Sequence, residues 1–414
     1  MASFLPSLLS IFSRNPLPLS LSFLSRPVTH PSPRPSYASL QNLPLELLEE
    51  IASHFDTFFP SLSVDSTQVG NQISLVSRRF RFFGQKLRWR HLRIDFSSIY
   101  SLSTHLELHP HLSSLVHCFE VRDPPNISRA PVRSEEDFHE LVEVLGKLKA
   151  LRRFGVVGKV NSALVEILEA AGNLDLLKQL YFVIAEDLIW TPECQSTILR
   201  GFKSLVNFSL QAHRLSLPPR TESQDPARQH LGGLVVLRLG WLSSVNAPPF
   251  LSDLIPQIFD LSSLRNCDLL DYAIATSLPV LIPHALNIQN LHIHISRPNI
   301  TAQLVGLLAN LNRMKFLEML TISNNQPEGG LFEAPFALVD LLQALPPSIK
   351  TVDARVLCFD YFASPTAELP LSDNSSIVRI YTVYVVEGEG RRLHVWMDKR
   401  EGEQHWYKLP KAIV

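Results

Sequence analysis

The chain has 414 residues, of which 45% are hydrophobic and 19% are charged, and its formal net charge is −1. This length corresponds to two or three ordinary domains or to one long repeat array. The near-neutral charge argues against nucleic acid as the main partner, because nucleic-acid-binding domains are usually basic. No apolar run approaches the roughly 20 residues that span a bilayer, so we expect a soluble protein without a membrane partner.

Residues 1–40 differ in composition from the rest of the chain. They contain ten serines, seven prolines, three arginines and no acidic residue. Because prolines interrupt any continuous helix there, the segment is expected to be a disordered tail. An organellar transit peptide is the alternative, since such peptides are rich in Ser and Arg and poor in acids. We therefore expect a cytoplasmic or nuclear protein, with a mitochondrial location as the minor alternative.

Two amphipathic helices are predicted between residues 41 and 95. In "LPLELLEEIASHF", Leu47, Ile51 and Phe55 share one face, and the acids lie near the helix start. In "SLVSRRFRFFGQKLRWRHLRI", residues 74–94 hold seven basic residues and four aromatics, a composition that suggests nucleic-acid binding. However, Val76, Phe80, Phe83 and Leu87 recur at helical spacing. The aromatics are thus mostly a packing face, and the basic residues mostly a solvated one.

Three ordered blocks in this region resemble an F-box. They are "LPLELLEEIASHF", "LVSRRFRFF" and "LRWRHLRI", and the spacer between the first two is longer than in a typical F-box. The resemblance implies docking on the Skp-family linker subunit of a cullin-type (SCF) ubiquitin ligase. It implies a linker-binding surface made of Leu43, Pro44, Leu47, Ile51, Leu75, Val76, Phe80, Trp89 and Leu92. The alternative is a first helical layer of a core that has no partner.

An irregular repeat of the pattern Leu-x-x-Leu-x-Leu, with any apolar residue at the marked places, follows a helical connector at 96–150. It starts at Leu151, Leu177, Leu205, Leu234, Leu264, Ile288, Leu317 and Ile349. Helix signals lie between these segments, such as Thr191 before Pro192. A strand, a loop and a helix at a period of 24 to 32 residues indicate a leucine-rich-repeat solenoid over 151–372.

Side chains alternate along a strand, so the residues between the marked apolar positions should line the inner, concave sheet. This row mixes amide, hydroxyl, aromatic and charged groups, which suits a protein target. The predicted target-binding residues are Gln179, Tyr181, Asn207, Arg238, Asp268 and His292, together with Ser209, Val236, Asn266, Asn290, Met319 and Thr321. Tyr181 and Arg238 are the expected anchors by residue type. His292 and His294 alternate with apolar residues, so both are expected to face away from the core as part of a binding surface.

Three β-branched and aromatic runs separated by Gly-containing turns predict a β-meander over 373–414 that caps the solenoid. The competing target site is the outer face of the solenoid or this meander, where Tyr381, Trp396, Trp406 and Tyr407 supply aromatic area.

The sequence contains no common catalytic motif such as GxSxG, a Walker loop or HExxH. The four cysteines, Cys118, Cys194, Cys267 and Cys358, are far apart and predict buried thiols in a reducing compartment. His105, His109, His111 and His117 cluster beside Cys118, but Pro110 breaks helical ligand spacing, so we expect ordinary histidines and no metal site. No cofactor or catalytic residue is expected.

The sequence therefore predicts an α/β chain: a short helical F-box module, an irregular leucine-rich-repeat solenoid and a C-terminal β-meander cap. The expected function is substrate recognition for an SCF ubiquitin ligase, without bond chemistry of its own. The expected partners are the Skp-family linker, a cullin through that linker, and an unidentified protein target. The alternatives are a non-catalytic repeat scaffold not linked to ubiquitin ligation and a nucleic-acid binder that uses the arginines at 78–93.

Overall fold

The computed structural model describes residues 78–123, 134–216, 233–241, 258–295, 310–324, 345–357, 379–385, 392–399 and 406–411. The chain divides into two compact units, residues 1–58 and 59–414, and every described residue belongs to the second unit. The predicted tail and the first F-box-like block therefore lie outside the described residues.

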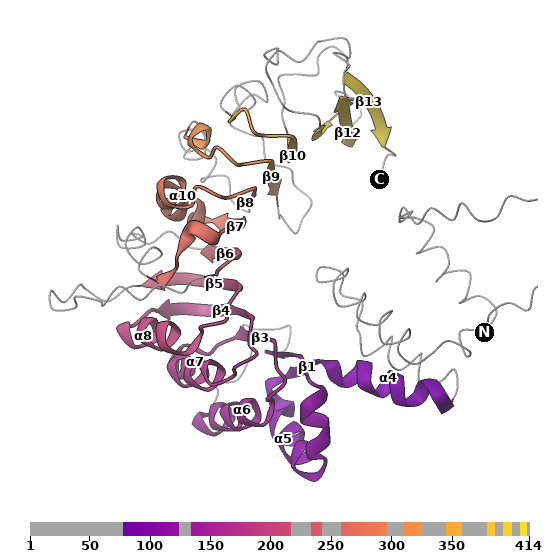
Figure 1. Ribbon diagram of the computed structural model, residues 1–414, viewed down its shortest axis with the longest axis vertical. Helices are drawn as coiled ribbons and strands as arrows, with labels where there is room; N and C mark the ends of the chain where they lie inside the picture. Colours follow the sequence, from indigo (N-terminus) through magenta and orange to yellow (C-terminus); the bar gives the residue numbers. More distant parts are fainter. Residues whose placement is uncertain are drawn as a thin grey trace, which may run out of the picture. The chain divides into compact units, whose positions relative to one another are not determined.

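The described part of the second unit is built on a 13-stranded sheet whose strands follow one another in chain order (Figure 1). Strands β1 to β10 each pair in parallel with the next strand, whereas β11 pairs antiparallel with β12, and β12 pairs antiparallel with β13. The strands are β1 (His91–Asp95), β2 (Cys118–Arg122), β3 (Arg153–Gly158), β4 (Gln179–Ile189), β5 (Asn207–Ser216), β6 (Val236–Trp241), β7 (Asn266–Asp271), β8 (Asn290–Ile295), β9 (Met319–Asn324), β10 (Thr351–Leu357), β11 (Arg379–Val385), β12 (Arg392–Lys399) and β13 (Trp406–Lys411).

Strands β3 to β10 coincide with the eight predicted repeat segments. Each strand begins two residues after the first apolar residue of its segment, as at Leu151 and Arg153. A single carbonyl before each strand accepts two consecutive N–H groups from the next repeat: His117 O accepts from Arg152 N at 2.8 Å and from Arg153 N at 3.0 Å. The same pair of hydrogen bonds recurs at the carbonyl oxygens of Arg152, Lys178, Val206, Val235, Arg265, Gln289 and Glu318. The repeats therefore share one backbone geometry despite their irregular lengths.

The core lies on one face of the sheet because burial alternates along the strands. In β7 and β8 every second residue is buried. Four of these residues, Cys267, Leu269, Leu291 and Ile293, are marked apolar positions, and the alternation continues beyond the pattern to Asp271 and Ile295. Neighbouring strands contribute in register, so that Phe119, Phe154, Leu180 and Phe208 form one continuous row. The predicted alternation of apolar and polar faces is confirmed.

Helices cover this apolar face (Figure 1). Helix α6 begins with a capping box, in which the Ser134 hydroxyl accepts from Asp137 N and the Asp137 carboxylate accepts from Ser134 N. Helix α8 begins at Pro192, as the sequence predicts, with Thr191 as its cap. The described α-helices are α4 (Arg78–Arg90), α5 (Ile99–Leu108), α6 (Glu135–Lys147), α7 (Leu164–Gly172), α8 (Pro192–Gly201) and α10 (Tyr272–His284). No helix in these ranges is long and apolar enough to cross a membrane.

The sheet begins earlier than the sequence analysis predicts. Strand β1 lies inside the predicted F-box-like module, and β2 lies inside the connector expected to be helical. The reason is visible in the sequence, because "WRHLRI" at Trp89 and "VHCFEV" at Val116 carry the same apolar spacing as the later repeats. The prediction of a purely helical connector over 96–150 is thus wrong, although α5 and α6 do lie within it.

Candidate functional site

The face of the sheet opposite the helices carries polar side chains in three rows that cross the strands. The central row consists of register partners Arg93, Glu120, Gly155, Tyr181, Ser209, Arg238, Asp268, His292, Thr321 and Asp353. A lower row, two residues earlier on each strand, includes Arg153, Gln179, Asn207, Asn266 and Asn290. An upper row, two residues later, includes Arg122, Leu270, His294 and Ser323. The twelve predicted target-binding residues all fall in the central and lower rows.

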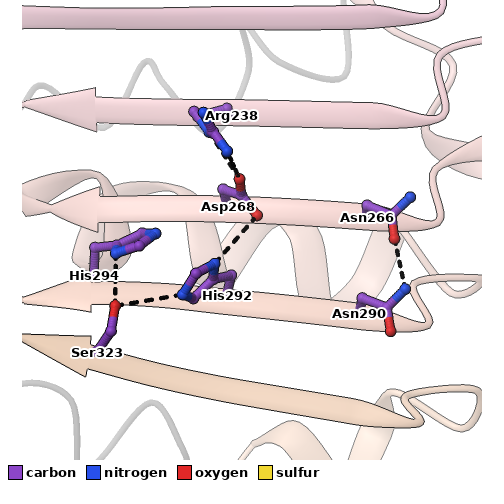
Figure 2. Close-up of polar contacts among 7 residues, drawn as sticks. All are labelled: Arg238, Asn266, Asp268, Asn290, His292, His294 and Ser323. Atoms are coloured by element: carbon purple, nitrogen blue, oxygen red, sulfur yellow. Dashed lines mark hydrogen bonds and ion pairs between the residues drawn. The ribbon is translucent and has the colours of Figure 1, made fainter. Parts of the chain in front are cut away.

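Five residues on strands β6 to β9 form a connected polar group, here called the histidine network (Figure 2). Asp268 accepts a hydrogen bond from Arg238 Nε at 2.7 Å and a second from the Nη2 group of the same arginine. His292 Nδ1 lies 3.9 Å from Asp268 Oδ1. Ser323 Oγ lies 3.4 Å from His292 Nε2 and 2.6 Å from His294 Nδ1. The structure thus brings together four residues that were predicted to face away from the core and one, Ser323, that was not singled out.

The electrostatics of the histidine network are balanced. The Arg238 guanidinium is matched by the Asp268 carboxylate, and the two imidazole rings of His292 and His294 are only 3.8 Å apart between centroids. The Arg238 side chain is 48% exposed, whereas the Asp268 side chain is 16% exposed. A partner that approaches this face would therefore meet the arginine and the imidazoles before it meets the carboxylate.

An amide pair lies beside the histidine network in the lower row. Asn290 Nδ2 donates to Asn266 Oδ1 at 2.6 Å (Figure 2). An asparagine side chain offers two donor hydrogens and one acceptor oxygen, so one bond between two amides leaves further bonding capacity on both. Such amides can pair with the peptide groups of a bound chain.

The residue types of Asp268, His292 and Ser323 are those of a serine hydrolase relay, but their surroundings differ from those of such a relay. Ser323 is 7% exposed, and its strand pairs with strands on both sides, so the surrounding N–H groups serve the sheet and form no preorganised oxyanion hole. In addition, Asp268 is held by Arg238, and the shorter bond of Ser323 is to His294. The geometry suits recognition of polar groups better than activation of a serine.

A second polar group, here called the arginine cluster, lies on strands β1 to β4. At its centre, Glu120 forms ion pairs with Arg93, whose Nε is 3.0 Å from Oε1, and with Arg122. The Tyr181 hydroxyl donates to the other oxygen of Glu120. The Arg153 guanidinium lies 5.1 Å from the centre of the Tyr181 ring.

Tyr181 reaches Glu120 by crossing the strand between them. The position on β3 that separates the two residues is Gly155, and a Cβ atom there would lie 1.9 Å from Cζ of the tyrosine ring. Only glycine leaves room for the ring. Burial raises the pKa of Tyr181 to about 12. Tyr181, predicted as an exposed target anchor, is therefore committed to a contact within the protein.

Most of the predicted linker-binding residues lie outside the described residues. These are Leu43, Pro44, Leu47, Ile51, Leu75 and Val76. Phe80 falls within helix α4. Trp89 and Leu92 are half-buried and pack against the core, and the Trp89 ring stacks on His105 at 5.4 Å with an interplanar angle of 3°. Both therefore contribute to the packing of the first repeat, and their role in linker binding stays a prediction.

The polar-face residues that the sequence analysis missed are Arg93, Glu120, Arg122 and Ser323. The first three were missed because β1 and β2 were not recognised as repeats, although the same apolar spacing is present there. Ser323 lies one alternation beyond the end of the six-residue pattern, where the strand continues. Extending the pattern by two residues would have included it.

The remaining candidates are the histidines, the cysteines and the C-terminal aromatics. The His105 and His109 rings lie tilted to each other, and the His109 and His111 rings form a T-shaped contact. No group of three potential ligands that could hold a metal occurs in the described ranges. Cys118 is half-buried, and Cys194 and Cys267 are buried. The C-terminal aromatics lie on strands as predicted: Tyr381 pairs in register with Trp396, and Trp406 and Tyr407 lie on β13.

Comparison with known proteins adds no assignment: no family model matches the chain, and no curated protein is significantly similar to it.

Proposed function

We propose that the chain is a non-catalytic substrate adaptor of an SCF ubiquitin ligase, with leucine-rich repeats that hold a protein target. The observation that carries this proposal is the polar face of the sheet, on which several rows of hydrogen-bonding groups extend over successive repeats. A broad face of amides, imidazoles and guanidinium groups offers many polar contacts and few apolar anchors, which suits a protein ligand. The F-box-like blocks before the repeats supply the link to the ligase.

The adaptor would act by proximity. The F-box-like segment would dock on the Skp-family linker, and through it on the cullin, while the repeat face binds the target. Holding the target near a ubiquitin-charged enzyme raises its effective concentration there without any bond chemistry by the chain itself. The proposed location is the cytoplasm or the nucleus.

Binding of the purified full-length chain to a Skp-family linker, measured by calorimetry and gel filtration, tests the proposal. The double variant Leu47→Glu/Ile51→Glu should abolish binding, because it places charges on the predicted apolar face of the first helix. The matched control is Arg81→Ala, since Arg81 is exposed on α4 and belongs to the solvated face. Absence of a complex with the unaltered chain would refute the adaptor function.

One observation favours a second candidate, a repeat scaffold that is not linked to ubiquitin ligation. The third F-box-like block, "LRWRHLRI", runs from the end of α4 into β1, where Trp89 and Leu92 pack on the core. In a scaffold this block would only seal the first repeat. The linker-binding experiment separates the two functions, because a scaffold binds no linker but keeps its polar face.

A further inference from the structure

The arginine cluster carries more positive than negative charge. Three guanidinium groups, those of Arg93, Arg122 and Arg153, surround the single carboxylate of Glu120. A second acidic residue, Asp95 on β1, is the register partner of Arg122 and is exposed. Three positive and two negative charges leave a net charge of about +1, and burial together with the neighbouring Arg93 guanidinium lowers the pKa of Arg122. The cluster therefore has positive charge that its own carboxylates do not balance.

The contact atoms show which part of each arginine is available. Glu120 meets both Arg93 and Arg122 through their Nε atoms. Within the described part of the chain, no hydrogen bond occupies the terminal amino groups of these two residues. Their side chains are 51% and 40% exposed. The paired N–H donors of two neighbouring guanidinium groups thus remain open to a ligand from solvent.

The cluster is also held in place before any ligand arrives. Glu120 is 13% exposed at its side chain, and both of its oxygens are used, one by the two arginines and the other by the Tyr181 hydroxyl. The Tyr181 ring is fixed in turn by the gap at Gly155 and by Arg153 above it. Arginine forks that are already oriented lose less freedom on binding, which favours affinity and geometric selectivity.

We infer that the arginine cluster is a binding site for an oxyanion, presented by an acidic segment of the protein bound on the polar face. The guanidinium fork matches the two oxygens of a carboxylate or a phosphate, so Asp, Glu and phosphoserine side chains share the required chemistry. The choice of a protein as the ligand rests on the proposed function. The site itself rests on the contacts of Arg93, Arg122 and Glu120.

The histidine network supplies an internal comparison. Arg238 lies in the same central row and is about as exposed as Arg93, at 48% and 51%. However, Arg238 donates through both Nε and Nη2 to Asp268, so it is matched one to one by a carboxylate. Oxyanion binding should depend on Arg93 and Arg122 and should not depend on Arg238.

The test uses fluorescein-labelled peptides of one length that carry adjacent glutamates, adjacent glutamines or a phosphoserine at the same position. Their binding to the full-length chain is measured by fluorescence anisotropy at low ionic strength. The glutamate peptide should bind and the glutamine peptide should not. Arg93→Gln/Arg122→Gln should weaken binding at least tenfold, and the control Arg238→Gln should change it less than twofold. Phosphoserine that binds more tightly than glutamate, with the same dependence on Arg93 and Arg122, would identify phosphate as the preferred form of the same site.

Two further variants keep the test decisive. Arg153→Gln removes one positive charge but no bond to Glu120, so it should weaken binding about threefold. This variant tests the site independently of whether Arg93→Gln/Arg122→Gln folds. Arg93→Lys/Arg122→Lys keeps the charge but removes the forks, so it should also lose affinity. Equal losses in the Arg238 variant, or full binding by the lysine variant, would overturn the inference. Leu47→Glu/Ile51→Glu should leave peptide binding intact, so that failure of linker docking and failure of this site remain distinguishable.

Discussion

Replacing Gly155 with alanine should destabilise the protein through a single contact. The new Cβ atom would lie 1.9 Å from Cζ of Tyr181 and 2.0 Å from Cε1, far inside van der Waals contact. These atoms belong to the Tyr181 ring, which lies over β3 between Arg153 and Glu120, so the ring must leave this position. Once it leaves, its hydroxyl can no longer reach Glu120.

The magnitude follows from the two losses. A hydrogen bond to a charged group contributes about 1.5–3 kcal/mol, and overpacking costs about 1–3 kcal/mol. Part of this is offset, because alanine within a strand is favoured over glycine by about 0.5–1 kcal/mol. We therefore expect Gly155→Ala to lower the free energy of unfolding by about 2–4 kcal/mol, measured by urea denaturation.

The sign should reverse when the ring is absent. In a Tyr181→Ala background the added methyl group meets no ring, and Gly155→Ala should raise the free energy of unfolding by about 0.5–1 kcal/mol through the strand preference alone. The resulting coupling energy between the two sites would be about 2.5–5 kcal/mol, well above the value for independent positions. The matched control is Gly146→Ala in α6, where a Cβ meets nothing within 4 Å and alanine should stabilise the helix by up to about 1 kcal/mol. A Gly155→Ala cost that persists without Tyr181 would refute the proposed crossing of β3.

Two further predictions follow from the packing. Trp89→Ala should lower the free energy of unfolding by about 2 kcal/mol in the absence of any partner, because the ring packs on the core and stacks on His105, whereas the neighbouring exposed Arg88→Ala should change it by less than about 0.5 kcal/mol. Equal effects of the two changes in urea denaturation would contradict the packing role of Trp89. Iodoacetamide should label the half-buried Cys118 before Cys267 in the folded protein, because burial raises the pKa of the Cys267 thiol and shields it from the reagent. Peptide mass mapping measures the order of labelling, and labelling of Cys267 first would contradict its burial.

The strands were predictable because a repeated apolar pattern leaves little freedom. Leu177, Leu180 and Phe182 must all reach one core, and a turn followed by a strand at this spacing places them there. The same regularity fixes which residues face away from the core, and so Arg238, Asp268 and His292 were correctly placed on one face. The beginning of the array was not predicted, although the same apolar pattern is present there. The arginine-rich residues 74–94 resemble part of an F-box, so the apolar spacing at Trp89, Leu92 and Ile94 was not interpreted as a repeat.

Contacts within the polar face were harder to foresee than its composition. Sequence alternation assigns each side chain to a face, but it does not say whether that side chain is satisfied by a neighbour or left for a ligand. Tyr181 and Arg238 were both expected to meet a target, yet each bonds to a carboxylate on another strand. For Arg238 the partner is on the adjacent strand, and a cross-strand pair of this kind can be inferred once the register is known.

For Tyr181 the partner is two strands away, and the decisive residue is the one that has no side chain. Gly155 occupies the central row between Tyr181 and Glu120, so a residue that contributes no polar group determines which polar groups meet. A glycine inside a strand marks a place where something approaches closely, and that signal was present in "LRRFGV". Its consequence extends to function, because Glu120, once held by Tyr181, orients Arg93 and Arg122 through Nε and leaves their terminal donors for a ligand. Tyr181, which is not available to a ligand, thus determines through Glu120 that Arg93 and Arg122 are available to one.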